Sequence, residues 1–148
     1  MRIVFDLEVY SNYFLAVFVC EDGTVESFER FNDSDLGDII KIANWLQGHT
    51  LISFNGKRYD MPLLSMAVNG STNAQIKEAS DKVIKDNSMW WHLEARYAFH
   101  TLDYDHIDII NLLPLYESLK MYGARNGTRK LQDLPFDPTT VIDARMSR

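Results

Sequence analysis

The stretch "IVFDLEVYS", residues 3–11, decides the expected fold and site, because it places two carboxylates in an apolar, strand-like run. Side chains at i and i+2 of a strand point the same way, so Asp6 and Glu8 project together while Phe5 and Leu7 face the other side. Two adjacent carboxylates repel each other unless protons or cations neutralise them. A hard cation such as Mg²⁺ or Mn²⁺ does so through oxygen ligands. The alternative is a strand end in solvent.

The residues around this stretch predict strands that alternate with helices. Asp22-Gly23 favours a hairpin, and Gly48 is an expected helix end. The aromatic-rich segment 88–104 fits a helix or, in part, a strand. Strands are predicted over 2–8, 12–20, 25–31, 50–54 and 106–110. Helices are predicted from after "NDSD" (32–35) to Leu46, from Asp60–Pro62 to Asn69, over 73–86, and from the last strand to about Gly123 with Pro114 in the early turns, before a loop-like tail from 124.

This order of elements predicts an α/β fold, a mixed sheet with an antiparallel hairpin at one side and helices covering it. With 46% hydrophobic and 12% aromatic residues, the chain should form a single packed domain over 1–148. Its one cysteine, Cys20, is expected in a buried strand and favours a reducing compartment. No signal peptide or membrane-spanning segment is evident, so a soluble cytoplasmic protein with no membrane partner is expected.

The net charge of −6 is unevenly distributed along the chain. Residues 1–116 carry nine Lys or Arg and 17 Asp or Glu, whereas residues 117–148 carry six and four. A basic cluster near the C-terminus could contact a few phosphates, or it could be an ordinary solvated loop. Its members are Lys120, Arg125, Arg129 and Lys130.

A second candidate motif lies in "LISFNGKRYDMPLL", residues 51–64, where an apolar strand and a tight turn lead into a helix. Asp60 falls at the start of that helix, and Asp is a good N-cap. An N-cap alone does not explain why Asn55, Tyr59 and Asp60 are grouped directly after a buried strand. The alternative is that Asp60 joins the two strand carboxylates in one site.

In this order and spacing, "FDLEVY", "SFNGKRYDMPLL" and "HIDII" resemble the 3′–5′ exonuclease domains of the DnaQ-like, or DEDD, superfamily, which have a ribonuclease-H-like fold. The closest form is the proofreading exonuclease of family B DNA polymerases and its stand-alone phage and bacterial relatives. The family's first motif, Asp-x-Glu, matches Asp6 and Glu8. Its second, Asn-x-x-x-Phe/Tyr-Asp, matches Asn55, Tyr59 and Asp60. The resemblance covers most of the chain.

The resemblance implies two-metal hydrolysis of phosphodiester bonds with Mg²⁺ or Mn²⁺. Asp6 would bridge both ions, Glu8 would help to bind one and orient the attacking water, and Asp60 would hold the other. Asn55 and Tyr59 would position the terminal nucleotide or the scissile phosphate. The implied substrate is single-stranded DNA, with RNA as an alternative, and a polymerase or another replication protein is an implied partner.

The chain departs from the family where a third motif, Tyr-x-x-x-Asp or His-x-x-x-x-Asp, should supply a fourth acid on a C-terminal helix. Tyr104 with Asp108 and His100 with Asp105 have these spacings. "HIDII" more closely resembles a family strand whose Asp starts the next helix, so Asp108 is given a structural role, with the metal site as the alternative. The remaining C-terminal acids lack the upstream Tyr or His; they are Asp133, Asp137 and Asp143.

Two explanations of the missing motif remain open. The chain is either the N-terminal piece of a longer exonuclease or a degenerate member, without the C-terminal helix, that binds nucleic acid or a replication partner and no longer cuts. Other patterns are weaker: the histidines lack zinc-site spacing, and there is no P-loop motif. Trp45, Trp90 and Trp91 could stack on bases, but burial in the core is the expectation.

Overall fold

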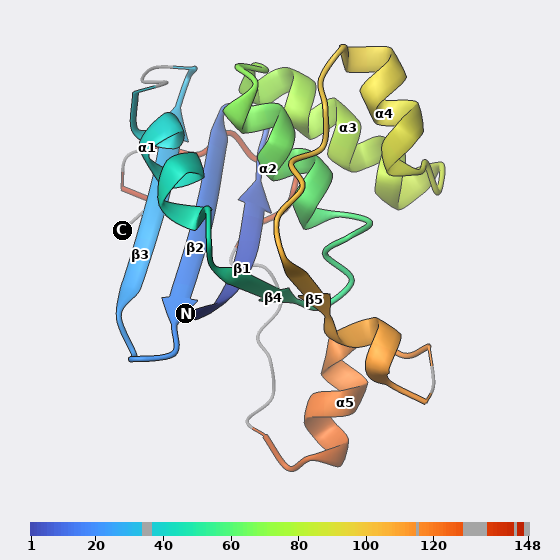
Figure 1. The fold of residues 1–148 in the computed structure, drawn as a ribbon. Helices are drawn as coiled ribbons and strands as arrows, with labels where there is room; N and C mark the ends of the chain where they lie inside the picture. The colour runs from blue at the N-terminus through green and yellow to red at the C-terminus, as the bar shows by residue number, and fades with distance from the viewer. Residues whose placement is uncertain (34–36, 115, 129–135, 144, 147–148) are drawn as a thin grey trace.

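A computed structural model describes residues 1–33, 37–114, 116–128, 136–143 and 145–146. Within these residues the chain forms a five-stranded mixed sheet in the order β3-β2-β1-β4-β5 (Figure 1). The β1–β2 and β2–β3 pairs are antiparallel, whereas β1–β4 and β4–β5 are parallel. The elements are, in chain order, β1 (Arg2–Val9), β2 (Tyr13–Cys20), β3 (Val25–Phe31), α1 (Gly37–Leu46), β4 (Thr50–Ser53), α2 (Asp60–Val68), α3 (Asn73–Lys85), α4 (Trp90–Tyr97), β5 (His106–Asp108), η1 (Ile109–Leu112, a 3₁₀ helix) and α5 (Leu119–Arg125).

The central strand β1 separates two environments. Its odd-numbered residues from Ile3 to Val9 are buried in the core, whereas Asp6 is exposed and Glu8 is half-buried on the opposite face. The predicted first strand and its alternation are therefore confirmed. The predicted hairpin is also present: Gly23 adopts a φ of 88° in the turn, which suits glycine.

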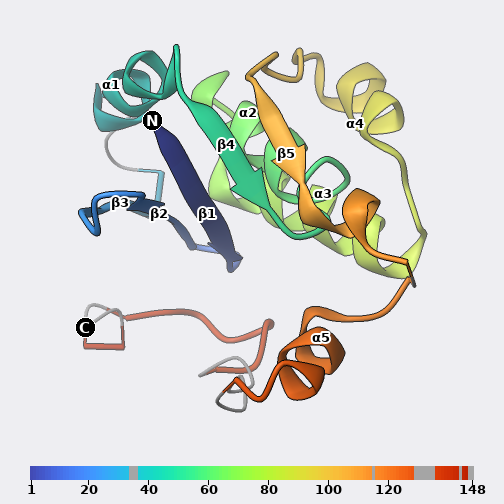
Figure 2. The same cartoon turned by 60° about the horizontal axis from the view of Figure 1, so that its bottom comes forward.

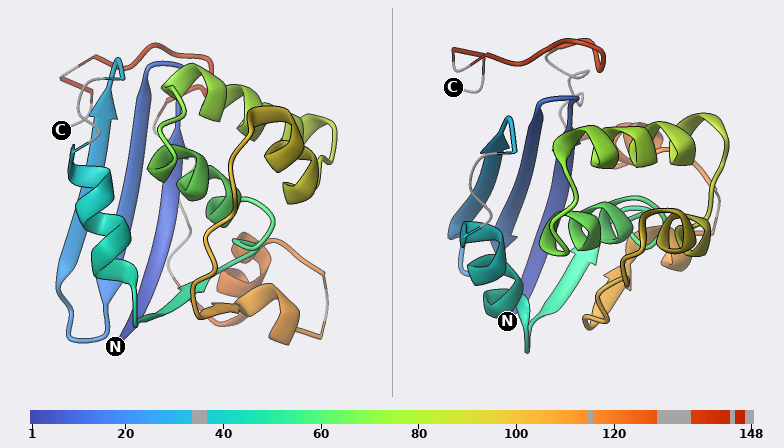
Figure 3. Two further views of the ribbon diagram at one scale, coloured as in Figure 1. Left: turned by 45° about the horizontal axis from the view of Figure 1, so that its top comes forward. Right: turned by 90° about the horizontal axis from the view of Figure 1, so that it is seen from above.

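Helices cover the apolar face of the sheet. Buried side chains from α1, α2, α3 and α4 join those of β1 to β4 in one hydrophobic cluster. Figure 3 shows α1 and α2 on one side of the sheet and the C-terminal segment on the other. The face of β1 that carries the carboxylates is therefore turned away from α1 and α2.

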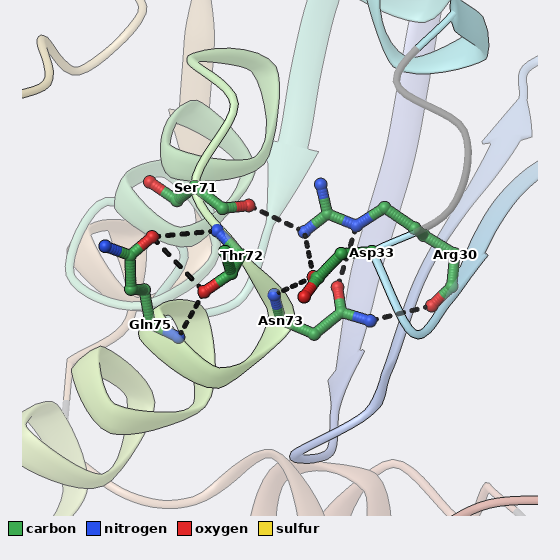
Figure 4. Close-up of polar contacts among 6 residues, drawn as sticks. All are labelled: Arg30, Asp33, Ser71, Thr72, Asn73 and Gln75. Carbon is green, nitrogen blue, oxygen red and sulfur yellow. Dashed lines mark hydrogen bonds and ion pairs between the residues drawn. The ribbon is translucent and has the colours of Figure 1, made fainter.

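A buried arginine fixes the edge strand β3 to the start of α3 (Figure 4). Arg30, which is 1% exposed, donates to Asn73 Oδ1 at 2.7 Å and to the Ser71 carbonyl at 2.8 Å. The Asn73 side chain donates back to the Arg30 carbonyl at 3.0 Å. Asp33 accepts from the Asn73 backbone N–H at 2.5 Å and lies 3.9 Å from the guanidinium group. The arginine is thus held by both hydrogen bonds and charge.

Most of the predicted helices are confirmed. α2 and α3 match the expected segments, and α3 begins after a capping box of Thr72 and Gln75. The first helix ends at Leu46 as expected. Of its candidate caps at 32–35, those at 34 and 35 lie outside the described residues. The ambiguous segment contains α4 followed by irregular chain. None of the described helices is long and apolar enough to cross a membrane.

The predicted helix from the last strand to Gly123 is wrong. The short η1 directly follows β5, and Leu113 leaves helical geometry with φ −93° and ψ 143°. Pro114 explains the break, because proline disfavours the α conformation of the residue before it. A separate helix, α5, starts after Ser118, whose side chain accepts from the Met121 N–H at 3.4 Å.

The expectation of buried tryptophans is wrong for two of the three. Trp90 and Trp91 are 40% and 46% exposed at the start of α4, where their rings meet edge to face. Trp45 is partly buried and packs its ring against Phe18. The α4 helix buries only Leu93, because it lies at the periphery of the helical layer.

Candidate functional site

The predicted acids lie at the carboxyl ends of the three parallel strands, which point the same way in Figure 2. Pairing of β1 with β4 stops at Val4 and Ile52, although β1 continues to Val9. The unpaired edge of β1 therefore faces the segment that follows β4, an arrangement that favours ligand binding in sheets of this kind. The acids at this end are Asp6 and Glu8 on β1, Asp60 at the first residue of α2, and Asp108 at the end of β5.

The two strand carboxylates are both more basic than usual. The pKa of Asp6 is raised, chiefly because the surrounding protein desolvates its carboxyl group, although the Leu7 backbone N–H partly offsets this. The pKa of Glu8 is raised by desolvation and, to a smaller extent, by the negative charge of Asp6. A nearby cation would relieve both effects.

Asp60 is a buried acid, 5% exposed, with an unsatisfied oxygen. Its Oδ1 has no hydrogen-bond partner among the residues that the structure describes. The pKa of Asp60 is raised to about 8, mainly by desolvation, then by the charge of Asp6 and less by that of Asp108. Backbone N–H groups of Asp60 and Leu7 offset part of this rise. Asp60 is therefore electrostatically coupled to β1.

The simpler explanation of Asp60, that it caps α2, does not hold. The N-cap position belongs to Tyr59, and no side-chain capping bond is made there. Asp60 instead occupies the first helical position, where a negative charge interacts favourably with the helix dipole. The dipole does not supply a partner for its buried oxygen.

Asp108 has a different role from Asp60 although it is equally buried. It accepts from the Asn55 N–H at 2.7 Å, the Lys57 N–H at 2.9 Å and the Ile110 N–H at 3.4 Å. These bonds fix the loop between β4 and α2, in which Asn55 adopts a positive φ of 62°, and also cap η1. The geometry supports the structural role expected for Asp108, and this residue positions the second motif.

Gly56 lies beside Asp60 and is not among the residues of the second motif. A Cβ at this position would lie 2.6 Å from the Ser53 Cβ and 3.2 Å from Asp60 Oδ2, so the loop needs glycine to pass this close. Ser53 is itself held by a 2.8 Å hydrogen bond between its Oγ and His106 Nε2. The Asn-Gly pair in the sequence was the available signal, because it marks a tight turn.

Tyr59 lies between the acids and α3. Its hydroxyl shares a 2.8 Å hydrogen bond with Ser80 Oγ. Burial raises the pKa of Tyr59 to about 12; the Ser80 bond opposes the rise, and the charges of Asp60 and Glu8 add to it. Tyr59 is thus a neutral, fixed group beside the carboxylates. Asn55 is half-buried in the same loop and is placed by its backbone bond to Asp108.

A cavity of about 500 Å³ opens beside the strand carboxylates. One wall is β1 with Asp6 and Glu8, the second is α3, and the third is the C-terminal segment 137–139. Its volume lies within the usual range for small-molecule sites. The full lining is Asp6, Leu7, Glu8, Val9, Tyr10, Tyr59, Lys77, Ser80, Asp81, Ile84, Lys85, Asp137, Pro138 and Thr139.

The turn between β1 and β2 holds the third wall of the cavity in place. Asn12 donates its Nδ2 to the Ile142 carbonyl at 2.8 Å and accepts from the Ile142 N–H at 2.9 Å. Ile142 is buried against Tyr10 and Tyr13. No local sequence pattern predicts that this segment lies beside β1, because the contact joins residues 130 positions apart.

Of the basic cluster near the C-terminus, the described members lie away from this cavity. Arg125 pairs with Glu117 at 2.8 Å, and its guanidinium carbon lies 5.9 Å from the centre of the Tyr122 ring. Lys120 belongs to the same short helix, and neither residue lines the cavity. Arg129 and Lys130 lie outside the described residues.

The charges of the acids affect one another's pKa values, but the side chains do not surround a common point as a metal site would. In the described part of the chain, no three His, Cys, Asp or Glu side chains are close enough to surround an ion as they stand. The donor chemistry nevertheless suits a hard cation, because the candidate ligands are carboxylate oxygens and Asp60 Oδ1 is buried without a partner.

Searches against protein-family models, curated proteins and solved structures find no match for this chain. Its function must therefore be inferred from the residues and their geometry.

Proposed function

We propose that this protein is a metal-dependent 3′–5′ exonuclease that hydrolyses the phosphodiester bonds of single-stranded DNA. The observation that carries the proposal is the buried Asp60, which has an unpartnered oxygen, a pKa of about 8 and a charge interaction with Asp6. A buried acid with a strongly raised pKa and a specific charge neighbour is a candidate functional group, because a bound cation would stabilise its ionised form in place of the proton. The five-stranded mixed sheet, with the strand order β3-β2-β1-β4-β5, is compatible with the ribonuclease-H-like fold of the family that the sequence resembles.

The acids suit Mg²⁺ or Mn²⁺, which prefer oxygen ligands and retain water molecules. Asp6, Glu8 and Asp60 would hold the metal, and when bound it would polarise the phosphodiester and lower the pKa of an attacking water. Glu8 is half-buried at the cavity wall, where it could orient that water and accept its proton. Tyr59, whose hydroxyl is fixed on α3, and Asn55 would position the terminal nucleotide.

A directional degradation assay tests the proposal. With Mn²⁺, a 5′-labelled single strand of DNA should shorten progressively from its 3′ end. Asp6→Asn and Asp60→Asn should lower the rate by about 100-fold or more, because each removes a charged ligand. Asp103→Asn, which changes an exposed acid outside the cavity, is the matched control and should keep the wild-type rate. Degradation undiminished by Asp6→Asn would refute the proposal.

A second candidate is a non-catalytic module of the same kind, bound to nucleic acid or to a replication partner such as a polymerase. Its support is that no three acids stand together as a complete metal site within the described residues. This function predicts salt-dependent binding of DNA with no cleavage under any divalent ion. Cys20, buried and unpaired with any other cysteine, agrees with a cytoplasmic setting for either function.

A further inference from the structure

The cavity beside the carboxylates has a second charged wall, on α3. Five residues of this helix line the cavity at spacings of three and four, so they share one helical face. Figure 3 (right) shows α3 beside the carboxyl end of β1, with which it is in contact. The lining residues of α3 are Lys77, Ser80, Asp81, Ile84 and Lys85.

Two lysines on this face share a single carboxylate. Lys77 and Lys85 both form ion pairs with Asp81, the second at 3.3 Å. Although desolvation opposes it, the two lysines lower the pKa of Asp81, which therefore stays ionised. Two ammonium groups against one carboxylate leave this wall with a net positive charge, and Asp81 holds both amines in defined positions.

The positive charge of Lys77 also acts on Asp137, on the C-terminal wall of the cavity. The pKa of Asp137 on the C-terminal wall is lowered, first by hydrogen bonds from Thr139 and then by the charge of Lys77. Asp6 and Glu8 on β1 form the opposite, negative wall. An anion entering the cavity is thus attracted to α3 and repelled from β1, unless a cation already lies at β1.

We infer that Lys77 and Lys85 form a phosphate site for the backbone of a polynucleotide, next to the phosphodiester that is cut. This inference rests on the proposed exonuclease function. The strand lies between α3 and the C-terminal segment, with the scissile phosphate toward β1 and its neighbour on the lysines. Asp81 acts as a positioning residue, because it contacts the amines rather than the strand.

Binding measured without turnover tests this site. Fluorescence anisotropy with 5′-labelled oligothymidylate and oligouridylate in Ca²⁺, with strand integrity checked on a gel, separates binding from cleavage. Lys85→Gln and Lys77→Gln should each weaken binding about 3- to 10-fold at low salt, and each should reduce the log–log salt slope by about 0.7. Lys82→Gln on the same helix, outside the cavity, should bind like the wild type. If the lysine substitutions weaken binding of both oligonucleotides, the lysines contact the phosphate backbone that the two share. If they weaken binding of only one, the backbone assignment is overturned.

The ion pairs of the two lysines with Asp81 provide a second test of the site. Asp81→Asn removes the competing charge, so it should tighten binding and steepen the salt slope, whereas a purely structural trio predicts no such gain. Lys85 is 70% exposed at its side chain, so its substitution remains informative if Lys77→Gln impairs folding. Lysine variants that bind like Lys82→Gln, or a wild-type chain that binds neither oligonucleotide, overturn the site.

These outcomes are separable from those of the degradation assay. Cleavage that depends on Asp6, together with lysine variants that bind normally, leaves the exonuclease and removes the phosphate site. Weakened binding in the lysine variants, together with cleavage unaffected by Asp6→Asn, leaves the phosphate site and removes the exonuclease.

Discussion

Two buried ionisable side chains in this molecule have opposite surroundings. Arg30, where β3 meets α3, is 1% exposed and has Asn73, Ser71 and Asp33 around its guanidinium group (Figure 4). Asp60, where α2 meets β1, is 5% exposed and has an Oδ1 without a partner in the described residues. Buried polar groups in folded proteins are nearly always hydrogen-bonded. The difference gives Arg30 a role in the fold and makes Asp60 a candidate ligand in the proposed metal site.

Asp108 shows that the contrast does not come from the sign of the charge. It is an aspartate as buried as Asp60, and its charge acts on Asp60. Three backbone N–H groups nevertheless satisfy both of its oxygens. Partner count, rather than residue type or burial, distinguishes the structural acid from the candidate ligand.

The largest effect is expected from replacing Arg30, the buried side chain whose charge and hydrogen-bonding groups are paired. Arg30→Met should lower the free energy of unfolding by roughly 3–5 kcal/mol, because Asn73 and the Ser71 carbonyl lose their partner in a buried place. Urea unfolding monitored by circular dichroism measures the change. Arg2→Met, which removes an exposed pair with Glu21, should change stability little. Equal effects of the two substitutions would remove the structural half of the comparison.

The second prediction concerns pH and the unsatisfied charge. The pKa of Asp60 in the folded, metal-free chain is about 8, above its value of about 4 in an unfolded chain, so the folded state binds this proton more tightly. Stability should therefore fall as pH rises toward 8. Desolvation lowers the pKa of His106 below 6.5, so this group stays neutral above that pH. Between pH 6.5 and 8 the expected loss is about 1–2 kcal/mol by urea unfolding.

Asp60→Asn is the control for that loss. It should flatten the pH dependence and exceed the wild type in stability at pH 8 without metal, because the buried charge is gone. Mn²⁺ should stabilise the wild type at pH 8 by binding the folded state, and should have a smaller effect on Asp60→Asn. A wild-type chain whose stability is constant from pH 6.5 to 8 would contradict the state assigned to Asp60.

The sequence predicts the framework of this comparison but not its decisive details. The alternation over 2–9 and the apolar run 51–54 establish β1 and β4, because local hydrophobic periodicity specifies which strand face is buried. The predicted helix failed before Pro114, because the proline holds Leu113 in an extended conformation and ends the helical segment early. Whether Asp60 or Asp108 keeps an unpaired oxygen depends on contacts between segments some 50 residues apart, as in the Asn55–Asp108 bond. Hydrophobic periodicity does not encode that choice, and the sequence-based assignment of Asp108 to a structural role rests only on the resemblance of "HIDII" to a family strand.

The third prediction tests the satisfied acid beside the site. Asp108→Asn replaces one acceptor oxygen with a donor amide, so one of the N–H groups of Asn55 and Lys57 loses its partner. The expected loss of stability is about 1.5 kcal/mol by urea unfolding, and it should be the same with or without Mn²⁺. A variant that keeps full stability but loses Mn²⁺ binding would instead make Asp108 a direct ligand, and the comparison between the two aspartates would fail.

The smallest effect is expected at Asn12, whose side chain is fully paired but only partly buried. Asn12→Ala removes both bonds to Ile142, and since solvent can replace them in part, unfolding should become easier by only about 1 kcal/mol. The effect should be local, because these bonds hold the C-terminal wall of the cavity. Limited proteolysis should therefore cut the C-terminal segment faster in this variant than in Asn111→Ala, a control at an exposed asparagine. Unchanged cleavage would mean that the buried Ile142 alone holds the wall, and that hydrogen-bond satisfaction matters for stability mainly where, as around Arg30, water cannot enter.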